Sequence, residues 1–226
     1  MSHPLRLAVF DVDGTLVDSQ HHINSAMQQA YAIQGLDCPP LEQVRGIIGL
    51  SLPLAMRKLS PDLDDAQYGA LVESYKATFK SKREADGEND SPPLYPGIRK
   101  LLDVLAQDDE LMLGVATGKS RRGLDAMLKG HDLGRAFVTL QVADNHPSKP
   151  HPSMLLAALS ESGVTAECAV MIGDTTFDME MGRAAGMRSI GVSWGYHTVD
   201  QLYGAGASHI VDDTLELHTL LRGFWG

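Results

Sequence analysis

The 226-residue sequence predicts a doubly wound α/β fold, with a parallel sheet covered by helices on both faces and an all-helical insertion after the first strand. Short apolar runs alternate with helical spacing from residue 94 onward, which is typical of a parallel sheet. Residues 18–91, by contrast, show helical spacing and no convincing strand. We therefore expect a Rossmann-like core of residues 1–17 and 92–226 and a helical domain of residues 18–91.

The first strand ends in two carboxylates. Leu7 to Phe10 form a continuous apolar run, as expected for a strand buried on both faces of a parallel sheet. Asp11 and Asp13 follow, and Gly14 gives the backbone freedom to turn out of the sheet. Two acids this close are unfavourable unless a cation or a proton lies between them. The stretch predicts a metal site or a catalytic carboxylate pair.

The insertion has the pattern of several helices. Ser19 is placed to cap the first of them, whose apolar residues recur every three or four positions up to Ile33. The expected elements that follow are a glycine-punctuated turn at 44–51, a helix beginning near Ser51, a helix over 64–82 and a polar, proline-terminated linker over 83–93.

The remainder of the chain alternates between strands and helices. Strands are expected at 111–116, 136–140, 169–172 and 189–193, with a short segment near Ile210. Helices are expected at 98–106, after Ser120, up to Ser162, at 177–185 and at 215–221.

Composition limits the classes of function. With 43% hydrophobic and 21% charged residues the chain is typical of soluble globular proteins, and no apolar run approaches the roughly 18 residues of a membrane span. The N-terminus lacks the apolar region of a signal peptide, and Cys38 and Cys168 form no CxxC pair, so we expect a reduced protein in the cytoplasm. A net charge of −10 argues against nucleic acid as a partner. An anionic substrate remains compatible, because a bound divalent cation reverses the local field.

Three further strand ends carry polar groups. The second predicted strand runs into Thr117 and Gly118, where a hydroxyl and backbone amides at a helix start form a cradle for anions. A nucleotide P-loop is excluded, because that motif needs a glycine where this chain has Leu113. Lys149 lies in a proline-stiffened segment, and Asp174 follows an apolar strand with Asp178 one helical turn later. Clustered carboxylate oxygens suit Mg²⁺.

In chain order, these groups resemble the four motifs of the haloacid dehalogenase superfamily, most closely its phosphoglycolate phosphatase-like members with a helical cap. The residues that carry the resemblance are Asp11-x-Asp13-Gly14-Thr15, Thr117-Gly118, Lys149-Pro150 and Gly173-Asp174-x-x-x-Asp178, together with Tyr95-Pro96-Gly97 at the return from the insertion. The ordered set is specific, although each motif alone is weak.

The resemblance implies a role for each residue. Asp11 is expected to attack phosphorus and form an aspartyl-phosphate, and Asp13 to serve as general acid and then general base. Phosphate is expected to contact Val12, Asp13, Thr117, Gly118 and Lys149. Mg²⁺ is expected to bind Asp11, the backbone carbonyl of Asp13, and Asp174, with Asp178 nearby or bound through water.

Three alternative chemistries of the same family differ at particular positions. Dehalogenases lack the second aspartate, and phosphonate hydrolases carry alanine there, so Asp13 favours phosphoryl transfer. A β-phosphoglucomutase-type enzyme keeps Asp13 but has a histidine where this chain has Ile23, and it remains the alternative, as does an inorganic pyrophosphatase. A phosphate-binding protein that keeps the phosphatase fold but has lost catalysis is disfavoured, because every catalytic residue type of the family is present.

The resemblance also implies a mobile cap that selects a small phosphorylated metabolite, with hinges near Val17–Asp18 and 91–93. Phosphoglycolate, a sugar phosphate or a nucleotide all suit the pattern. Arg45 is expected to bind a second anion of the substrate, with a plain surface arginine as the alternative, and Gly49 lies in the same loop. We expect a monomer or a homodimer.

Overall fold

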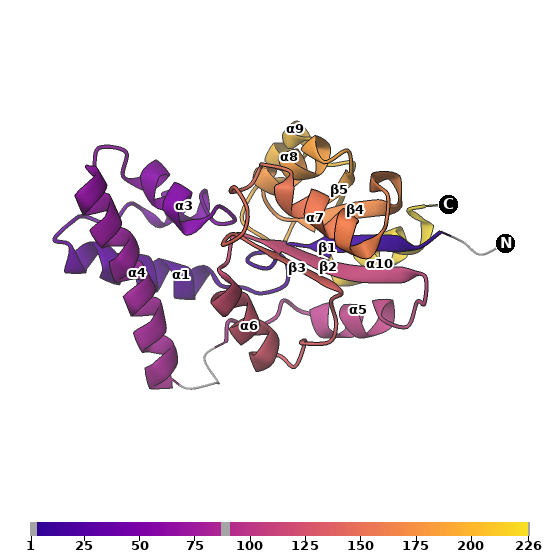
Figure 1. The fold of residues 1–226 in the computed structure, drawn as a ribbon, viewed down its shortest axis with the longest axis horizontal. Coiled ribbons are helices and arrows are strands. Elements are labelled where there is room, and N and C mark those ends of the chain that lie inside the picture. Colours follow the sequence, from indigo (N-terminus) through magenta and orange to yellow (C-terminus); the bar gives the residue numbers. More distant parts are fainter. Residues whose placement is uncertain (1–3, 87–90, 226) are drawn as a thin grey trace.

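The computed structural model describes residues 4–86 and 91–225, and it confirms the predicted fold class. Figure 1 shows a sheet with helices on both sides and a separate group of helices beside one end of it. All strands of the six-stranded sheet are parallel, in the order β3-β2-β1-β4-β5-β6. They are β1 (Arg6–Phe10), β2 (Leu111–Thr117), β3 (Thr139–Val142), β4 (Ala169–Gly173), β5 (Arg188–Val192) and β6 (His209–Val211).

This strand order places a topological switch at the centre of the sheet. From β1 the chain continues to β2 and β3 on one side, and then crosses to β4, β5 and β6 on the other. The crevice beyond the carboxyl ends of β1 and β4 is therefore the place where such sheets bind ligands. Asp11 directly follows β1, and Asp174 directly follows β4.

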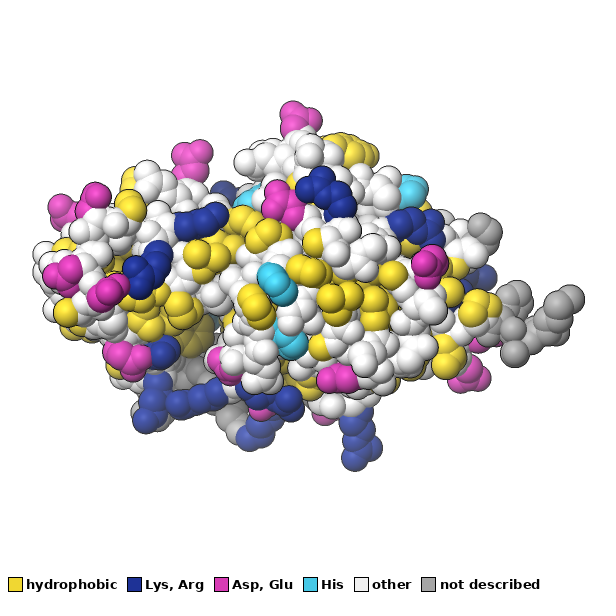
Figure 2. Space-filling model, turned by 45° about the horizontal axis from the view of Figure 1, so that its top comes forward, with side chains coloured by type: hydrophobic (Ala, Val, Ile, Leu, Met, Phe, Trp, Pro, Cys, Tyr) yellow, Lys and Arg dark blue, Asp and Glu magenta, His cyan; other side chains and the backbone are white. Residues whose placement is uncertain are grey.

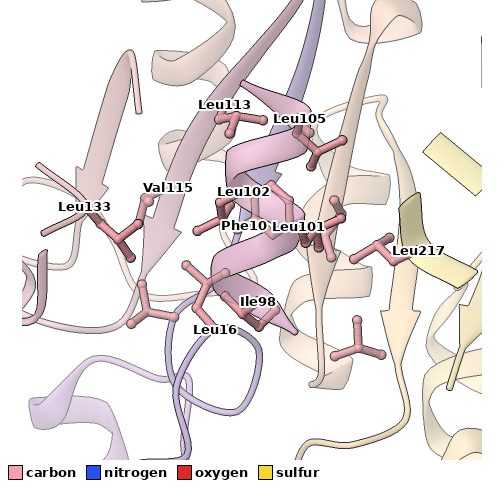
Figure 3. Packing of buried hydrophobic residues seen from close by; sticks show 14 of the residues in the cluster. Phe10, Leu16, Ile98, Leu101, Leu102, Leu105, Leu113, Val115, Leu133 and Leu217 are labelled. Atoms are coloured by element: carbon pink, nitrogen blue, oxygen red, sulfur yellow. The ribbon is translucent and has the colours of Figure 1, made fainter. Parts of the chain in front are cut away.

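Alternate residues of β1 enter two hydrophobic cores. Ala8 and Phe10 face a larger core that includes α5, α6 and α10, whereas Leu7 and Val9 face a second core under α7 and α8. Figure 3 shows Phe10 and Leu16 packed against Leu101 and its neighbours on α5. Burial on both faces explains the continuous apolar run. The core helices are α5 (Ile98–Leu105), α6 (Arg121–Gly130), α7 (Ser153–Ser162), α8 (Thr176–Ala184), α9 (Val199–Ala205) and α10 (Thr214–Gly223), with a 3₁₀ turn at Ala166–Cys168.

The predicted strand at 136–140 is wrong in position. The observed strand β3 is displaced toward the C-terminus, and Thr139 to Val142 pair with Gly114 to Thr117 of β2. Val138 is 59% exposed, so its apolar side chain does not contribute to the core that the run suggested. The helix α9 was not predicted.

Residues 20–86 contain four helices, here called the helical unit: α1 (Gln20–Ile33), α2 (Leu41–Arg45), α3 (Leu52–Leu59) and α4 (Asp65–Asp86). They share a hydrophobic cluster that includes Met27, Tyr31, Met56 and Leu71. No strand occurs among residues 18–86. The short helix α2 was not predicted, and its last two residues fall in the expected turn at 44–51. The helix α4 runs into the predicted linker, of which residues 87–90 lie outside the described part of the chain.

The chain leaves and re-enters the core at adjacent points. Val17 and Leu94 form an antiparallel bridge, and the Asp18 amide donates to the Pro93 carbonyl at 2.9 Å. The two connections to the helical unit therefore lie side by side, at the residues predicted as hinges.

Figure 2 shows how side chains are distributed over one face of the molecule, where several basic side chains lie together along the lower left edge. Hydrophobic side chains occupy much of the middle of this face, and basic and acidic side chains both lie mainly around its edge. No described helix is long and apolar enough to cross a membrane.

Candidate active site

Asp11 and Lys149 form a buried ion pair at the centre of the sheet edge. The Lys149 Nζ atom lies 2.9 Å from Asp11 Oδ1, and both side chains are almost completely excluded from solvent. Burial raises the pKa of Asp11 to about 7, an effect that Lys149 opposes and the neighbouring Asp178 reinforces. The carboxylate is thus held in a site that favours its ionised form only while positive charge is close.

Lys149 is shared between two carboxylates. Its Nζ atom also donates to Asp178 Oδ1 at 2.7 Å. Burial lowers the pKa of Lys149, but the charges of Asp11 and Asp178 more than offset this, and the net pKa lies above its usual value. Lys149 is therefore a fixed positive charge, as its proline-stiffened loop suggested.

Asp178 combines two roles in one side chain. Its Oδ2 atom accepts hydrogen bonds from the Thr175 amide at 3.1 Å and from the Thr175 hydroxyl at 2.7 Å, and the bond from the amide belongs to a capping box at the start of α8. Its Oδ1 atom is occupied by Lys149. Both carboxylate oxygens of Asp178 therefore accept hydrogen bonds within the site.

Asp174 is held by two donors from distant parts of the chain. The Thr15 hydroxyl donates to its Oδ1 at 2.8 Å, and the Tyr196 amide donates to its Oδ2 at 2.9 Å. Burial raises the pKa of Asp174 well above its usual value, and the charge of Asp11 adds to this. Gly14 is required here, since a Cβ atom would lie 2.1 Å from Asp174 Oδ2 and its φ of +87° disfavours other residues.

The buried carboxylates fit a divalent cation. Asp11, Asp174 and Asp178 each offer an oxygen within 4.8 Å of the others, and Asp11 Oδ2 accepts no hydrogen bond from the described residues. A buried carboxylate oxygen without a hydrogen-bond partner destabilises the folded protein unless a ligand or an ion binds to it. Hard oxygen donors in this arrangement match the preference of Mg²⁺.

Asp13 lies apart from that cluster and has its own partners. Its Oδ1 atom is 2.8 Å from Lys119 Nζ and also accepts a short hydrogen bond from the Ser19 hydroxyl. The predicted cap at Ser19 is therefore wrong: Ser19 occupies the N-cap position of α1, but its side chain makes no capping bond and turns to Asp13 instead.

The segment Thr117–Gly118 meets the helical unit directly. Thr117 ends β2 with its side chain buried, and a Cβ atom on Gly118 would lie 2.5 Å from the Gly49 carbonyl oxygen and 2.6 Å from that of Leu50. The absence of a side chain at Gly118 thus permits close contact of the two parts. The Ser51 amide adds a hydrogen bond to the Ser148 hydroxyl at 2.8 Å.

Two residues of the helical unit had been predicted to face the substrate. Gly49 lies against Gly118 and Thr175, at the rim of the carboxylate cluster. Arg45 ends α2 and is partly buried, and its Nε atom has no hydrogen-bond partner among the described residues. Burial raises the pKa of Tyr95, and the positive charge of Arg45 opposes this rise.

The structure brings together most of the residues that sequence motifs pointed to. Asp11, Val12, Asp13, Thr117, Lys149, Asp174 and Asp178 are all buried at the carboxyl ends of the strands. Sequence reasoning missed the partners: Thr15, Ser19, Lys119 and Tyr196. Thr15 and Lys119 adjoin motifs and so could have been suspected, whereas Tyr196 carries no comparable signal.

Comparison with known proteins identifies the class to which this fold and site belong. The profile of the haloacid dehalogenase-like hydrolase family matches residues 8–192, and the chain therefore belongs to this family of hydrolases. The chain is 37% identical over 225 residues to the protein named "Probable phosphatase IndB" of Dickeya dadantii, covering 96% of this chain and 95% of that relative. It is 28% identical over 219 residues to a phosphoglycolate phosphatase of Pseudomonas savastanoi pv. phaseolicola, covering 94% and 78%.

Solved structures show the same architecture. A phosphatase from Clostridium acetobutylicum, described as predicted, superposes with a TM-score of 0.85 at 25% identity over 98% of this chain and 100% of that one. A hydrolase from Pseudomonas syringae gives a TM-score of 0.84 at 25% identity with the same coverage. The predicted family membership is thus confirmed.

Proposed function

We propose that the protein is a Mg²⁺-dependent phosphatase that hydrolyses a small phosphate monoester through a covalent intermediate on Asp11. The observation that carries this proposal is the buried Asp11, paired with Lys149, with one carboxylate oxygen free of hydrogen bonds and Asp13 held separately nearby. A nucleophile and a proton-transfer group with distinct environments suit a two-step displacement. The names of the relatives, phosphatase and phosphoglycolate phosphatase, support the same reaction.

In the first step, an oxygen of Asp11 forms a bond to phosphorus while the bond from phosphorus to the leaving oxygen breaks. Asp13 gives its proton to that oxygen, which departs as an alcohol. In the second step, Asp13 takes a proton from water, whose oxygen attacks phosphorus and releases Asp11 and inorganic phosphate. Lys149 and the Thr117 hydroxyl, with the Gly118 amide, would hold the phosphoryl oxygens.

Asp11, the backbone carbonyl of Asp13, and Asp174 would hold Mg²⁺, with Asp178 in reach through water. The metal ion would supply positive charge that offsets the repulsion between an anionic nucleophile and an anionic ester. Four carboxylates here (Asp11, Asp13, Asp174, Asp178) face two ammonium groups (Lys119, Lys149), a formal excess of two negative charges that a divalent cation balances.

We further propose that the helical unit, within residues 18–91, acts as a cap that selects the substrate, with Arg45 and Gly49 at its contact with the core. Phosphoglycolate, a sugar phosphate or a nucleotide is the expected class of substrate. Cys38 and Cys168 are both free, which suits a reduced cytoplasmic protein. No observation favours the mutase: Ile23, where a mutase has histidine, is packed in the hydrophobic cluster of the helical unit.

The experiment is phosphate release from p-nitrophenyl phosphate and from a panel of phosphorylated metabolites, with MgCl₂ or with EDTA. We expect turnover only with Mg²⁺, and a loss of at least about 10³-fold in Asp11→Asn. Asp103→Asn, which changes an exposed aspartate of α5, is the matched control and should behave as the unaltered protein. Equal turnover in EDTA, or full activity of Asp11→Asn, would overturn the proposal.

A further inference from the structure

Tyr196 connects three parts of the site. Its backbone amide donates to Asp174 Oδ2, and its hydroxyl lies 3.2 Å from the Ser19 hydroxyl oxygen. Its ring packs against the hydrophobic cluster of the helical unit, all of whose other described members come from residues 23–75. One core residue thus contacts the candidate metal cluster, the helical unit and the partner of Asp13.

The direction of the hydrogen bonds follows from the chemistry of a hydroxyl group. Ser19 has a single hydrogen, and Asp13 Oδ1 also faces the Lys119 ammonium group, so Ser19 donates to this oxygen. Ser19 must then accept from its other neighbour, which makes Tyr196 the donor of the second bond. The chain of donors therefore runs from Tyr196 through Ser19 to Asp13.

Both described contacts of the Asp13 side chain are made to the same oxygen. Lys119 approaches Oδ1 from the core, and Ser19 approaches Oδ1 from the start of α1. These contacts fix the carboxylate plane and leave Oδ2 as the oxygen that can exchange a proton with a substrate.

Resting on the proposed function, we infer that Tyr196 is a positioning residue for proton transfer by Asp13, acting through the Ser19 hydroxyl. Its hydroxyl aligns Ser19, and Ser19 aligns Asp13 so that Oδ2 faces the leaving oxygen. Because the ring also packs against the helical unit, this alignment depends on the helical unit being seated on the core.

The test compares two leaving groups. An alkyl phosphate must receive a proton on its leaving oxygen, whereas p-nitrophenolate departs as a stable anion without one. The value of kcat/KM covers the step in which the leaving group departs. We therefore expect Tyr196→Phe, which keeps the ring and the amide, to lower the ratio of kcat/KM for the alkyl phosphate to that for p-nitrophenyl phosphate by about five- to tenfold, the effect of one lost hydrogen bond.

2-Phosphoglycolate, or the best alkyl substrate of the metabolite panel, serves as the alkyl phosphate. Ser19→Ala should lower the same ratio, and the double variant should lower it no further than Ser19→Ala alone, because both changes break one chain of hydrogen bonds. Tyr203→Phe is the matched control, since Tyr203 is 54% exposed on α9, and it should leave the ratio unchanged.

An unchanged ratio in Tyr196→Phe, or an equal fall for both substrates, would overturn the inference and leave the proposed function intact. Fully additive effects of the two changes would also contradict it. If the unaltered protein with Mg²⁺ hydrolysed neither kind of ester, the proposed function itself would fail.

Discussion

Lys149 is the residue on which the charge balance of the site depends. Its Nζ atom lies 2.9 Å from Asp11 Oδ1 and 2.7 Å from Asp178 Oδ1, and all three side chains are buried. A buried carboxylate that loses its only cationic partner is strongly destabilised. The same lysine is the proposed contact for the transferred phosphoryl group, so stability and activity should fail together when it is removed.

Lys149→Met tests this coupling. At about pH 8 we expect the metal-free variant to lose about 3–5 kcal/mol of unfolding free energy, because two buried carboxylates lose their partner. At about pH 5 the loss should be smaller, since these carboxylates can then take up protons. Turnover should fall by at least about 10²-fold. Urea denaturation and phosphate release measure the two effects.

The matched control is Lys100→Met, which removes an exposed lysine of α5 and should change neither quantity. A Lys149→Met protein as stable as the unaltered one at about pH 8 would contradict the described ion pairs.

The pH dependence of metal-free stability is a second prediction at this scale. The pKa of Asp11 is raised to about 7 by burial, so the folded state without metal binds a proton that the unfolded chain releases. Because folding raises the pKa of this carboxyl group, the free energy of unfolding falls as the pH rises from about 4 to about 7. Each unit by which folding raises the pKa corresponds to about 1.4 kcal/mol. In EDTA the melting temperature should therefore fall across this range.

Added Mg²⁺ should raise the melting temperature more at about pH 8 than at about pH 5, because a metal competes with the proton for the same oxygens. Asp11→Asn should show a shallower dependence in EDTA and a smaller gain from Mg²⁺. Stabilisation by Mg²⁺ that is equal at both pH values would count against a carboxylate site.

The sequence predicted the location of a side chain correctly where the neighbouring residues leave only one suitable location for it. Two aspartates after an apolar run, followed by glycine, predicted that Asp11 and Asp13 lie at the carboxyl end of β1, and the chemistry assigned to them stays a prediction. The prediction was wrong for Ser19, whose hydroxyl can cap a helix or contact a side chain, and only the approach of Asp13 in space decides between the two.

At the scale of elements, the strands that lie in the centre of the sheet were predicted within one residue. Their apolar runs are long and buried on both faces, as for β1 and β4. The edge strand β3 was misplaced, because an edge strand is short and Val138 beside it is apolar but exposed. Polar composition likewise suggested a linker where α4 continues to Asp86.

Gly118 marks the contact between β2 and the loop after α2. Gly118→Ala would place a methyl group within 2.6 Å of two carbonyl oxygens of the helical unit, which cannot move aside as a flexible side chain could. We expect the helical unit to be held away from the core, with kcat/KM reduced at least about tenfold. The core should stay folded, so the melting temperature should change by only a few degrees.

Steady-state kinetics and small-angle scattering check this prediction, the second through a larger radius of gyration. Gly134→Ala is the control, because a Cβ atom there has nothing within 4 Å. Unchanged kinetics in Gly118→Ala would show that close contact at this point is not needed for turnover.

At the scale of the whole molecule, the site combines residues that lie far apart in the sequence. The doubly wound sheet supplies Asp11, Asp174 and the loop of Lys149 at one edge, and Val17 and Leu94 hold the two connections to the helical unit together. The architecture could be predicted from alternation and motif order. The contact of Tyr196 with the helical unit could not, since it depends on how the two parts pack.

The central claim is that Asp11 carries the phosphoryl group and Asp13 moves the protons. The most direct test is the mass of the intact protein after brief reaction with p-nitrophenyl phosphate and Mg²⁺. Asp13→Asn can still lose p-nitrophenolate but lacks the base for the second step, so it should gain the mass of one phosphoryl group, located by peptide mapping to Asp11. Asp11→Asn should gain none. A phosphoryl group on any other residue, or none in Asp13→Asn while Asp11→Asn keeps its activity, would contradict this account.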